Sequence, residues 1–198
     1  MKVLLLIDIQ NDFLPGGALA VPDGDAVVPV ANRLIQSARH VVATQDWHPK
    51  DHGSFASQHA GIDVGDLFEL DGLTQVAWPD HCIQGTRGAE FAATLNVDRI
   101  DHVVQKGTDR LIDSYSGFFD NGHRQSTGLH DYLQSIGATE LLVAGLATDY
   151  CVKFTVIDAL ELGYCVRVML DGCRGVNLNA GDSDQAIAMI SEAGAMLV

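Results

Sequence analysis

Apolar runs and stretches of helical periodicity alternate along most of the chain. The continuous apolar run at 3–8 is typical of a parallel strand buried on both faces, and we predict further strands at 41–45, 102–105, 140–145, 165–170 and 195–198. Apolar positions at helical spacing predict helices at 25–37, 129–136, about 150–162 and 184–193. This alternation predicts one α/β domain, with a mostly parallel sheet of about six strands and helices on both faces.

Local signals mark the ends of these elements. Thr148 and Asp149 offer two capping side chains at the start of the helix that runs to about 162. Glycine-rich segments at 16–17, 22–24 and 172–175 predict turns. No repeat or linker divides the chain, so we expect a single domain over 1–198.

One segment departs from this alternation. Residues from about 47 to 101 contain no convincing long periodic element, whereas connections in compact domains usually measure about 4 to 6 residues. A connection of this length is usually functional. It also holds four of the eight histidines, which are His48, His52, His59 and His81.

Composition narrows the classes of function. The 198 residues include 12 Lys and Arg against 26 Asp and Glu, a formal net charge of −14, and 47% are hydrophobic. A nucleic-acid binder needs clustered cations, and the chain has no basic run, so we exclude nucleic acid as a partner. We also expect no membrane partner, because no stretch approaches the roughly 18 to 20 apolar residues that span a bilayer. The acidity is best taken as a solubility property.

The cysteines indicate a reducing compartment. The apolar run at 3–7 is about half as long as the core of a signal peptide, and no cleavage site follows it. We therefore expect free thiols in the cytoplasm rather than disulfides. No pair has the CxxC spacing of a thiolate zinc site. The four cysteines are Cys82, Cys151, Cys165 and Cys173.

Ionic residues close the predicted strands. Asp8, Asp46 and Lys106 follow the first three strands, and Cys151 lies just after the fourth. Ligands of open α/β sheets bind beyond the carboxyl ends of the strands, so these groups are candidates for one site. A helix start favours a thiolate at Cys151, Asp8 can accept its proton, and Lys106 can keep Asp8 ionised. For Cys151 alone, a small buried hydrophobe is the competing interpretation.

A second candidate site lies in the long segment. Asp46 and His48 are followed by His52 and, further on, by His81. One carboxylate and three imidazoles suit a divalent ion such as zinc, iron or manganese. Because histidines four residues apart also occur by chance, a solvated loop remains an alternative.

These residues lie in motifs that together resemble a known family. The chain resembles the nicotinamidases, also called pyrazinamidases, of the isochorismatase-like cysteine hydrolase superfamily. The matching motifs occur in the family's order and run almost from end to end. They are IDIQNDF at 7–13, ATQDWHP at 43–49, WPDHC at 78–82, QKG at 105–107, DSYS at 113–116 and GLATDYCV at 145–152.

The resemblance implies roles for the first group of residues. Cys151 would be the nucleophile, Asp8 the base and Lys106 the third catalytic member. The backbone N–H groups of Ala147 and Cys151 would form the oxyanion hole. A cis peptide bond would join Leu146 to Ala147.

The resemblance also implies a metal site and a ring-binding site. One divalent ion would be bound, with zinc the first choice and iron or manganese the alternatives, and it would orient the pyridine ring. Its ligands would be Asp46, His48, His52 and His81. The residues around the ring would be Phe13, Leu19, Trp78 and Tyr115.

The implied reaction is the hydrolysis of nicotinamide to nicotinate and ammonia through a cysteine thioester, as a step of NAD salvage. Pyrazinamide is expected as a second substrate. Two alternatives stay open: a sister hydrolase of the superfamily that acts on isochorismate, a carbamoyl compound or another small amide, and a metal-binding scaffold with an inert cysteine. The state of assembly is also open, and a homo-oligomer is compatible with the sequence.

Overall fold

The computed structural model describes residues 1–198 and contains one parallel sheet of six strands in the order β5-β2-β1-β6-β7-β8. All neighbouring strands of this sheet are parallel. The predicted α/β architecture is confirmed. The strands are β1 (Lys2–Ile7), β2 (Val41–Asp46), β5 (His102–Lys106), β6 (Glu140–Leu146), β7 (Cys165–Arg174) and β8 (Met196–Leu197).

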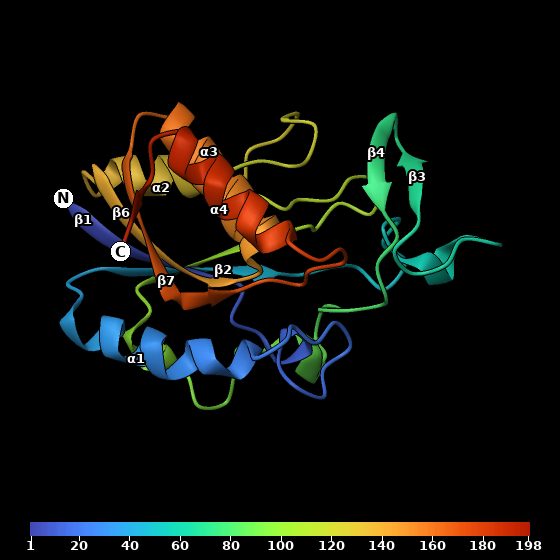
Figure 1. Ribbon diagram of the computed structural model, residues 1–198, viewed down its shortest axis with the longest axis horizontal. Coiled ribbons are helices and arrows are strands. Elements are labelled where there is room, and N and C mark those ends of the chain that lie inside the picture. Colours follow the sequence, from blue (N-terminus) through green and yellow to red (C-terminus); the bar gives the residue numbers. More distant parts are fainter.

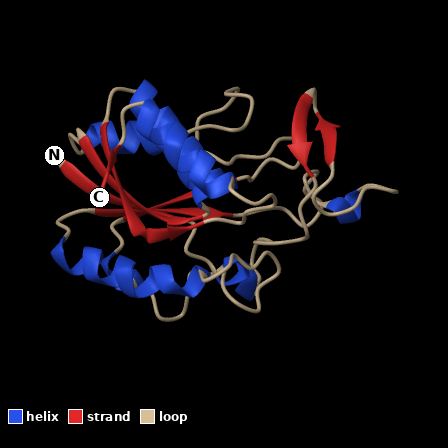
Figure 2. Cartoon of the chain, viewed as in Figure 1, coloured by secondary structure: helices blue, strands red, loops and turns tan.

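Helices cover both faces of the sheet, as the alternation predicted. The helix α1 lies on one face, and α2, α3 and α4 lie on the other (Figure 1; Figure 2). The α-helices are α1 (Val27–Ser37), α2 (Leu129–Ser135), α3 (Lys153–Glu161) and α4 (Asp182–Glu192). Single-turn 3-10 helices lie at Asn11–Phe13, Gly24–Ala26, Ala56–Gln58, Arg87–Ala89 and Val97–Arg99.

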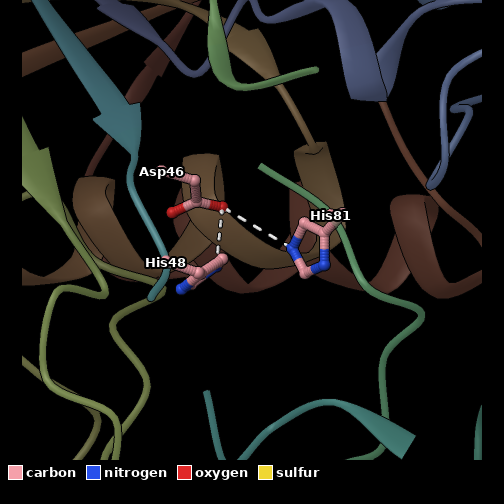
Figure 3. A group of neighbouring side chains, drawn as sticks. All are labelled: Asp46, His48 and His81. Carbon is pink, nitrogen blue, oxygen red and sulfur yellow. Dashed lines mark ion pairs between the residues drawn. The ribbon is translucent and has the colours of Figure 1, made fainter. Parts of the chain in front are cut away.

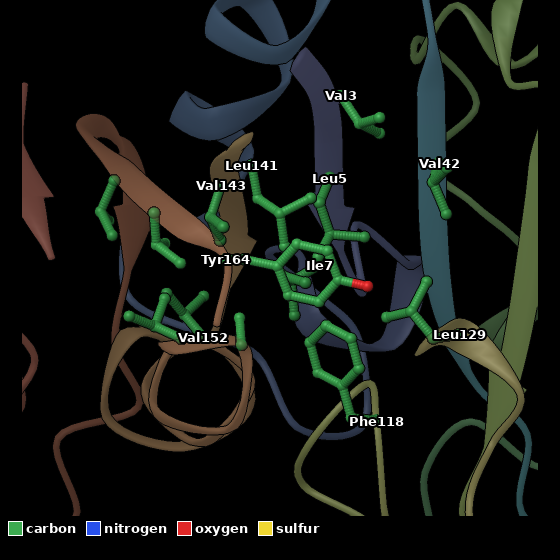
Figure 4. Packing of buried hydrophobic residues seen from close by; sticks show 14 of the residues in the cluster. Val3, Leu5, Ile7, Val42, Phe118, Leu129, Leu141, Val143, Val152 and Tyr164 are labelled. Atoms are coloured by element: carbon green, nitrogen blue, oxygen red, sulfur yellow. The ribbon is translucent and has the colours of Figure 1, made fainter. Parts of the chain in front are cut away.

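The core is divided by the sheet into two apolar layers. Successive side chains of a strand point to opposite faces, so Val3, Leu5 and Ile7 belong to one layer, while Leu4 and Leu6 belong to the other. The first layer packs against α2, α3 and α4, and the second packs against α1. Figure 4 shows part of the first layer, with Leu129 of α2 facing the strands. Because both faces are covered, every residue of β1 after the first is buried.

The strand order places a crevice beside β1. The chain moves from β1 to β2 and β5 on one side, and then returns through β6 to the other side of β1. Such a change of direction opens a crevice at the carboxyl ends of the strands, where α/β proteins bind ligands. Asp8 directly follows β1, and the segment 147–152 directly follows β6.

The strand β7 is longer than predicted. It continues through Gly172 to Arg174, where the glycine-rich segment 172–175 had predicted a turn. The glycine serves close packing instead, because a Cβ at position 172 would lie 3.1 Å from the Cβ of Ala144 and 3.2 Å from Val30 Cγ1. The prediction of a turn there was wrong.

The long segment contains a two-stranded antiparallel hairpin that the periodicity missed. It is formed by β3 (Leu67–Leu70) and β4 (Leu73–Val76), and it stands apart from the main sheet (Figure 1). Asp71 and Gly72 both have positive φ, of 48° and 79°, as a two-residue hairpin turn requires. The Asp-Gly pair is a hairpin signal, but the flanking strands have only four residues each.

The helix predicted to follow β6 is divided into two parts. A π-helical turn spans Thr148–Val152, and α3 begins at Lys153. Asp149 does not cap this helix. Its carboxylate instead accepts the backbone N–H groups of Val176 and Asn177, at 2.9 and 2.7 Å, and so binds the segment after β7 to the start of the turn.

Two further observations concern the chain as a whole. None of its helices combines the length and the apolar character needed to cross a membrane. All four cysteines are free thiols: Cys82, Cys151 and Cys173 are buried, and Cys165 is exposed.

Candidate active site

The ammonium group of Lys106 connects three side chains at the ends of neighbouring strands. Its Nζ lies 3.0 Å from Asp8 Oδ2 and 3.4 Å from the sulfur of Cys151. It also donates to Asp46 Oδ1 and, at 2.9 Å, to the carbonyl of Ser114. Lys106 is only 1% exposed, so these partners replace water around its charge. The structure therefore brings together the four ionic and nucleophilic groups that were predicted to close the strands.

Burial and charge set the protonation of this cluster. Burial raises the pKa of Asp8 to about 6, although the charge of Lys106 lowers it. Burial also raises the pKa of the Cys151 thiol well above its usual value, again against the lowering effect of Lys106. At neutral pH the thiol keeps its proton and Asp8 is mostly ionised. The position at a helix start does not by itself produce the thiolate that the sequence suggested, and the thiol needs a base.

Asp8 has one free oxygen for that purpose. Its Oδ1 accepts the hydroxyl of Thr44 at 2.6 Å, while its buried Oδ2 has no hydrogen-bond donor apart from the nearby charge of Lys106. One carboxylate oxygen of Asp8, one of Asp46 and the sulfur of Cys151 all lie within 4.8 Å of one another. Asp8 is thus placed to exchange a proton with the sulfur.

The segment after β6 approaches β1 closely. A Cβ at Gly145 would lie 2.1 Å from the carbonyl oxygen of Ile7, and the φ of Gly145 is 137°, so this position requires glycine. The peptide bond between Leu146 and Ala147, just after this glycine, is cis, as the family pattern implies. Both Ala147 and Cys151 line the cavity described below.

Asp46 also faces two of the predicted histidine ligands (Figure 3). Its Oδ2 lies 3.7 Å from His48 Nε2 and 4.0 Å from His81 Nε2, while Lys106 occupies Oδ1. Burial raises the pKa of Asp46, but the charge of Lys106 and the contact with His48 lower it by more. The net pKa is therefore well below its usual value. Burial and the neighbouring His48 lower the pKa of His81 to about 4.

The hydrogen bonds of the three histidines leave the same ring nitrogen available. The Nδ1 atoms of His48 and His81 contact the carbonyls of Gly107 and Pro79, at 2.9 and 2.8 Å, and that of His52 contacts the Ser54 hydroxyl at 2.7 Å. Such bonds fix the ring orientation of metal-ligating histidines and leave Nε2 for the ion. The Nε2 of His52 is buried without any partner. These donors fit a divalent metal ion.

The predicted ligands do not form a single group. Asp46, His48 and His81 have ligand atoms within 4.8 Å of one another, but His52 belongs to a second group of this kind, with His48 and Asp113. The rings of His48 and His52 are 4.4 Å apart between centroids. His48 therefore joins the two groups.

A cavity lies between the sulfur of Cys151 and the imidazoles of His48 and His81. It includes all four residues predicted around the ring, Phe13, Leu19, Trp78 and Tyr115. The hydroxyl of Tyr115 accepts the indole N–H of Trp78 at 3.1 Å, so two walls of the cavity support each other. Most of the residues that line it are hydrophobic, as is usual for small-ligand pockets.

The model of one family, described as the isochorismatase domain, matches residues 2–198. The chain belongs to the isochorismatase family. It is 56% identical over 200 residues to the nicotinamidase of Escherichia coli, and the alignment covers 99% of this chain and 93% of that protein. The predicted family is confirmed.

Solved structures of the isochorismatase fold agree. The nicotinamidase and pyrazinamidase of Acinetobacter baumanii superposes with a TM-score of 0.96 and 43% identity, covering 100% of this chain and 95% of that one. The pyrazinamidase of Pyrococcus horikoshii, solved in complex with zinc, superposes with a TM-score of 0.81 and 33% identity over 100% and 98% of the two chains.

In this member of the isochorismatase family, the cavity is also lined by three residues to which the sequence analysis gave no role. Tyr150 packs edge-on against Trp78, with ring centroids 4.8 Å apart. Asp113 lies beside the histidines, and Val176 comes from the segment after β7. Tyr150 and Asp113 fall inside the family motifs, which was a usable signal. Val176 had none, because it reaches the cavity through tertiary contacts, among them the bond from its backbone N–H to Asp149.

Proposed function

We propose that this protein is a nicotinamidase, which hydrolyses nicotinamide to nicotinate and ammonia and accepts pyrazinamide as a second small-molecule substrate. The relatives named above carry this activity in their names. The observation that carries the proposal is that Lys106 lies between Asp8 and Cys151 at the edge of a cavity bordered by Asp46, His48 and His81.

The first half of the reaction forms a thioester. The free oxygen of Asp8 takes the thiol proton of Cys151, and the sulfur attacks the carboxamide carbon. When the tetrahedral intermediate collapses, protonated Asp8 gives its proton to the departing amine, which leaves as ammonia. A carboxylate with a pKa of about 6 suits both steps, because it can take and return a proton near neutral pH.

The oxyanion of the intermediate requires donors at the turn after β6. We assign this role to the backbone N–H groups of Ala147 and Cys151, both of which line the cavity. Lys106 lies 3.4 Å from the sulfur and stabilises the thiolate electrostatically while the new bond forms.

The second half of the reaction releases the acid. Asp8 takes a proton from water, and the resulting hydroxide attacks the thioester carbon. The bond between carbon and sulfur then breaks, and the proton on Asp8 returns to the sulfur of Cys151. Nicotinic acid leaves and releases its own proton to the solvent, which gives nicotinate. The cluster is restored with its original charges.

In this proposal the role of the metal site is to position the substrate. Asp46, His48, His52 and His81 would hold one divalent ion, for which zinc is our first choice. When bound, the ion would act as a Lewis acid that holds the ring nitrogen of the substrate. Lys106 donates to Asp46 Oδ1 and so directs Oδ2 toward the histidines.

Aromatic walls complete the binding of the ring. Trp78 and Tyr115 are fixed by the hydrogen bond between them, and Phe13 and Leu19 add apolar surface. A ring held in this way keeps the carboxamide close to Cys151, which lowers the entropic part of the barrier.

An ammonia-release assay with nicotinamide tests the proposal. Cys151→Ala should abolish ammonia release while the fold and the metal content stay intact. Cys165→Ala, which changes an exposed cysteine on β7, is the matched control and should keep full turnover. Near-normal turnover by Cys151→Ala would refute the nucleophile, and wild-type protein without stoichiometric metal would favour a sister amide hydrolase.

A further inference from the structure

Asp113 is a buried carboxylate without a cationic partner. It is 3% exposed, and its two oxygens accept the backbone N–H of Ser114 at 2.7 Å and the side-chain amide of Gln75 at 3.2 Å. No lysine or arginine makes an ion pair with it. Burying a carboxylate with neutral partners alone costs free energy that a nearby cation would offset.

Asp113 also lies with two histidines. Its ligand atom and those of His48 and His52 are all within 4.8 Å of one another. Ligands of one zinc ion, each about 2.1 Å from the metal, can be about 4 Å apart, so a small closure would bring these atoms around one ion. His52 supplies an independent sign of a ligand, because its buried Nε2 has no partner.

The two groups share His48, which has one ring nitrogen available, and this favours one bound ion over two. This residue belongs to both groups, but its Nδ1 contacts the carbonyl of Gly107, so only Nε2 is available for a metal. Asp46 belongs to one of these groups and Asp113 to the other, so an ion at that nitrogen would draw on both carboxylates. The two groups are then parts of one coordination site.

The charges of the buried residues support the same conclusion. Asp8, Asp46 and Asp113 are buried carboxylates, and Lys106 is the only buried ammonium group near them. If all are ionised, two negative charges are left over. A divalent ion neutralises them, whereas without it the cavity would carry an uncompensated charge.

We propose that Asp113 is the second carboxylate of the metal site and supplies part of the negative charge that the ion neutralises. This proposal rests on the metal site of the proposed function, but it concerns binding of the ion rather than hydrolysis. It explains why a buried carboxylate lies in the wall of a cavity for a neutral substrate.

Zinc binding to the metal-free protein tests this role directly. Apoprotein prepared with a chelator is titrated with zinc against a competing fluorescent indicator, without substrate. Asp113→Asn should weaken zinc binding by at least about 10- to 100-fold, which is the usual effect of losing even a group that only supports the ligands. The melting temperature of the metal-free variant should stay at the wild-type value, while the rise caused by zinc should shrink.

Asp120→Asn is the matched control. Asp120 is another buried carboxylate of the same segment, but it accepts backbone N–H groups of Gly122, Arg124 and Gln125, and it lies outside the cavity. The zinc affinity of the Asp120→Asn protein should equal that of the wild type. Wild-type affinity in Asp113→Asn would overturn the proposal.

A folding defect is separated by a second measurement. If metal-free Asp113→Asn melts early, the visible absorption of the cobalt-substituted wild type and Asp113→Glu is compared. Retained zinc binding and an altered spectrum in Asp113→Glu support a carboxylate at the ion, and an unchanged spectrum refutes it. The zinc titration uses no substrate, so it is independent of the activity. If Asp113→Asn loses zinc binding while the wild-type protein does not hydrolyse nicotinamide, this inference stands and only the proposed function is overturned.

Discussion

The ammonium group of Lys106 lies 3.4 Å from the sulfur of Cys151, and both groups are buried. The contact joins the ends of two strands that are not neighbours in the sheet, since β2 and β1 lie between β5 and β6. A fixed charge at this distance stabilises a thiolate more strongly in a buried site than in water. It also holds two carboxylates, Asp8 and Asp46, that would otherwise repel each other.

Replacing this charge should impair both activity and stability. In Lys106→Met the pKa of Asp8 and that of the thiol should rise further, because the charge that lowers both is gone. We expect turnover to fall by about 10² to 10³, as when one stabilising donor is removed from an active site. Unfolding should become easier by about 3 to 5 kcal/mol, because buried carboxylates lose their partner.

Steady-state kinetics and denaturant titration measure these effects. Lys2→Met removes an exposed lysine that pairs with Glu140 on the surface, and it should change neither quantity appreciably. Turnover of Lys106→Met at the wild-type level would contradict the assigned role.

The acid limb of the pH profile should report Asp8. The base form exists above its pKa, so kcat/KM should rise through about pH 6 and fall below it. The hydroxyl of Thr44 donates to Asp8 and lowers that pKa. Thr44→Val should therefore move the acid limb to higher pH. Thr155→Val, which removes a buried hydroxyl that accepts the N–H of Gly117, should leave the limb in place.

The absence of a side chain at Gly107 should be required for the position of the His48 ring. The φ of Gly107 is +62°, and a Cβ there would lie 2.4 Å from Cε1 of the imidazole. Gly107→Ala should displace the ring and weaken zinc binding. Gly137→Ala is the control, because its φ is +71° but nothing lies within 4 Å of the added carbon. Both variants should lose about 1 kcal/mol of stability from backbone strain. Equal zinc affinities would contradict this prediction.

Removal of the metal should act mainly on substrate binding. If the ion positions the ring, protein treated with a chelator should show a large increase in KM for nicotinamide and a lower melting temperature. Re-addition of zinc should restore both. Cys151→Ala protein should show the same change in melting temperature, because its ligand set is intact. Unchanged kinetics in fully metal-free protein would exclude a positioning role.

The sequence determined the repeating architecture and the order of the strand ends. Buried parallel strands are rich in apolar residues, and the apolar stretches of β1, β2, β5 and β6 located these strands to within one or two residues. The strand ends then identified Asp8, Asp46 and Lys106. Gly172 misled the prediction, because a glycine that permits close packing and one that forms a turn are the same residue in a sequence.

Only the tertiary structure decided which of these residues meet. The sheet order places β1 beside β6 and so brings Asp8 to Cys151, although they are far apart in the chain. It also divided the histidines into two groups joined through His48 and added Asp113 to one of them. Local patterns record burial and backbone preference, which act over a few residues, whereas the pKa of a thiol and the partners of a carboxylate depend on groups that the fold collects from distant segments.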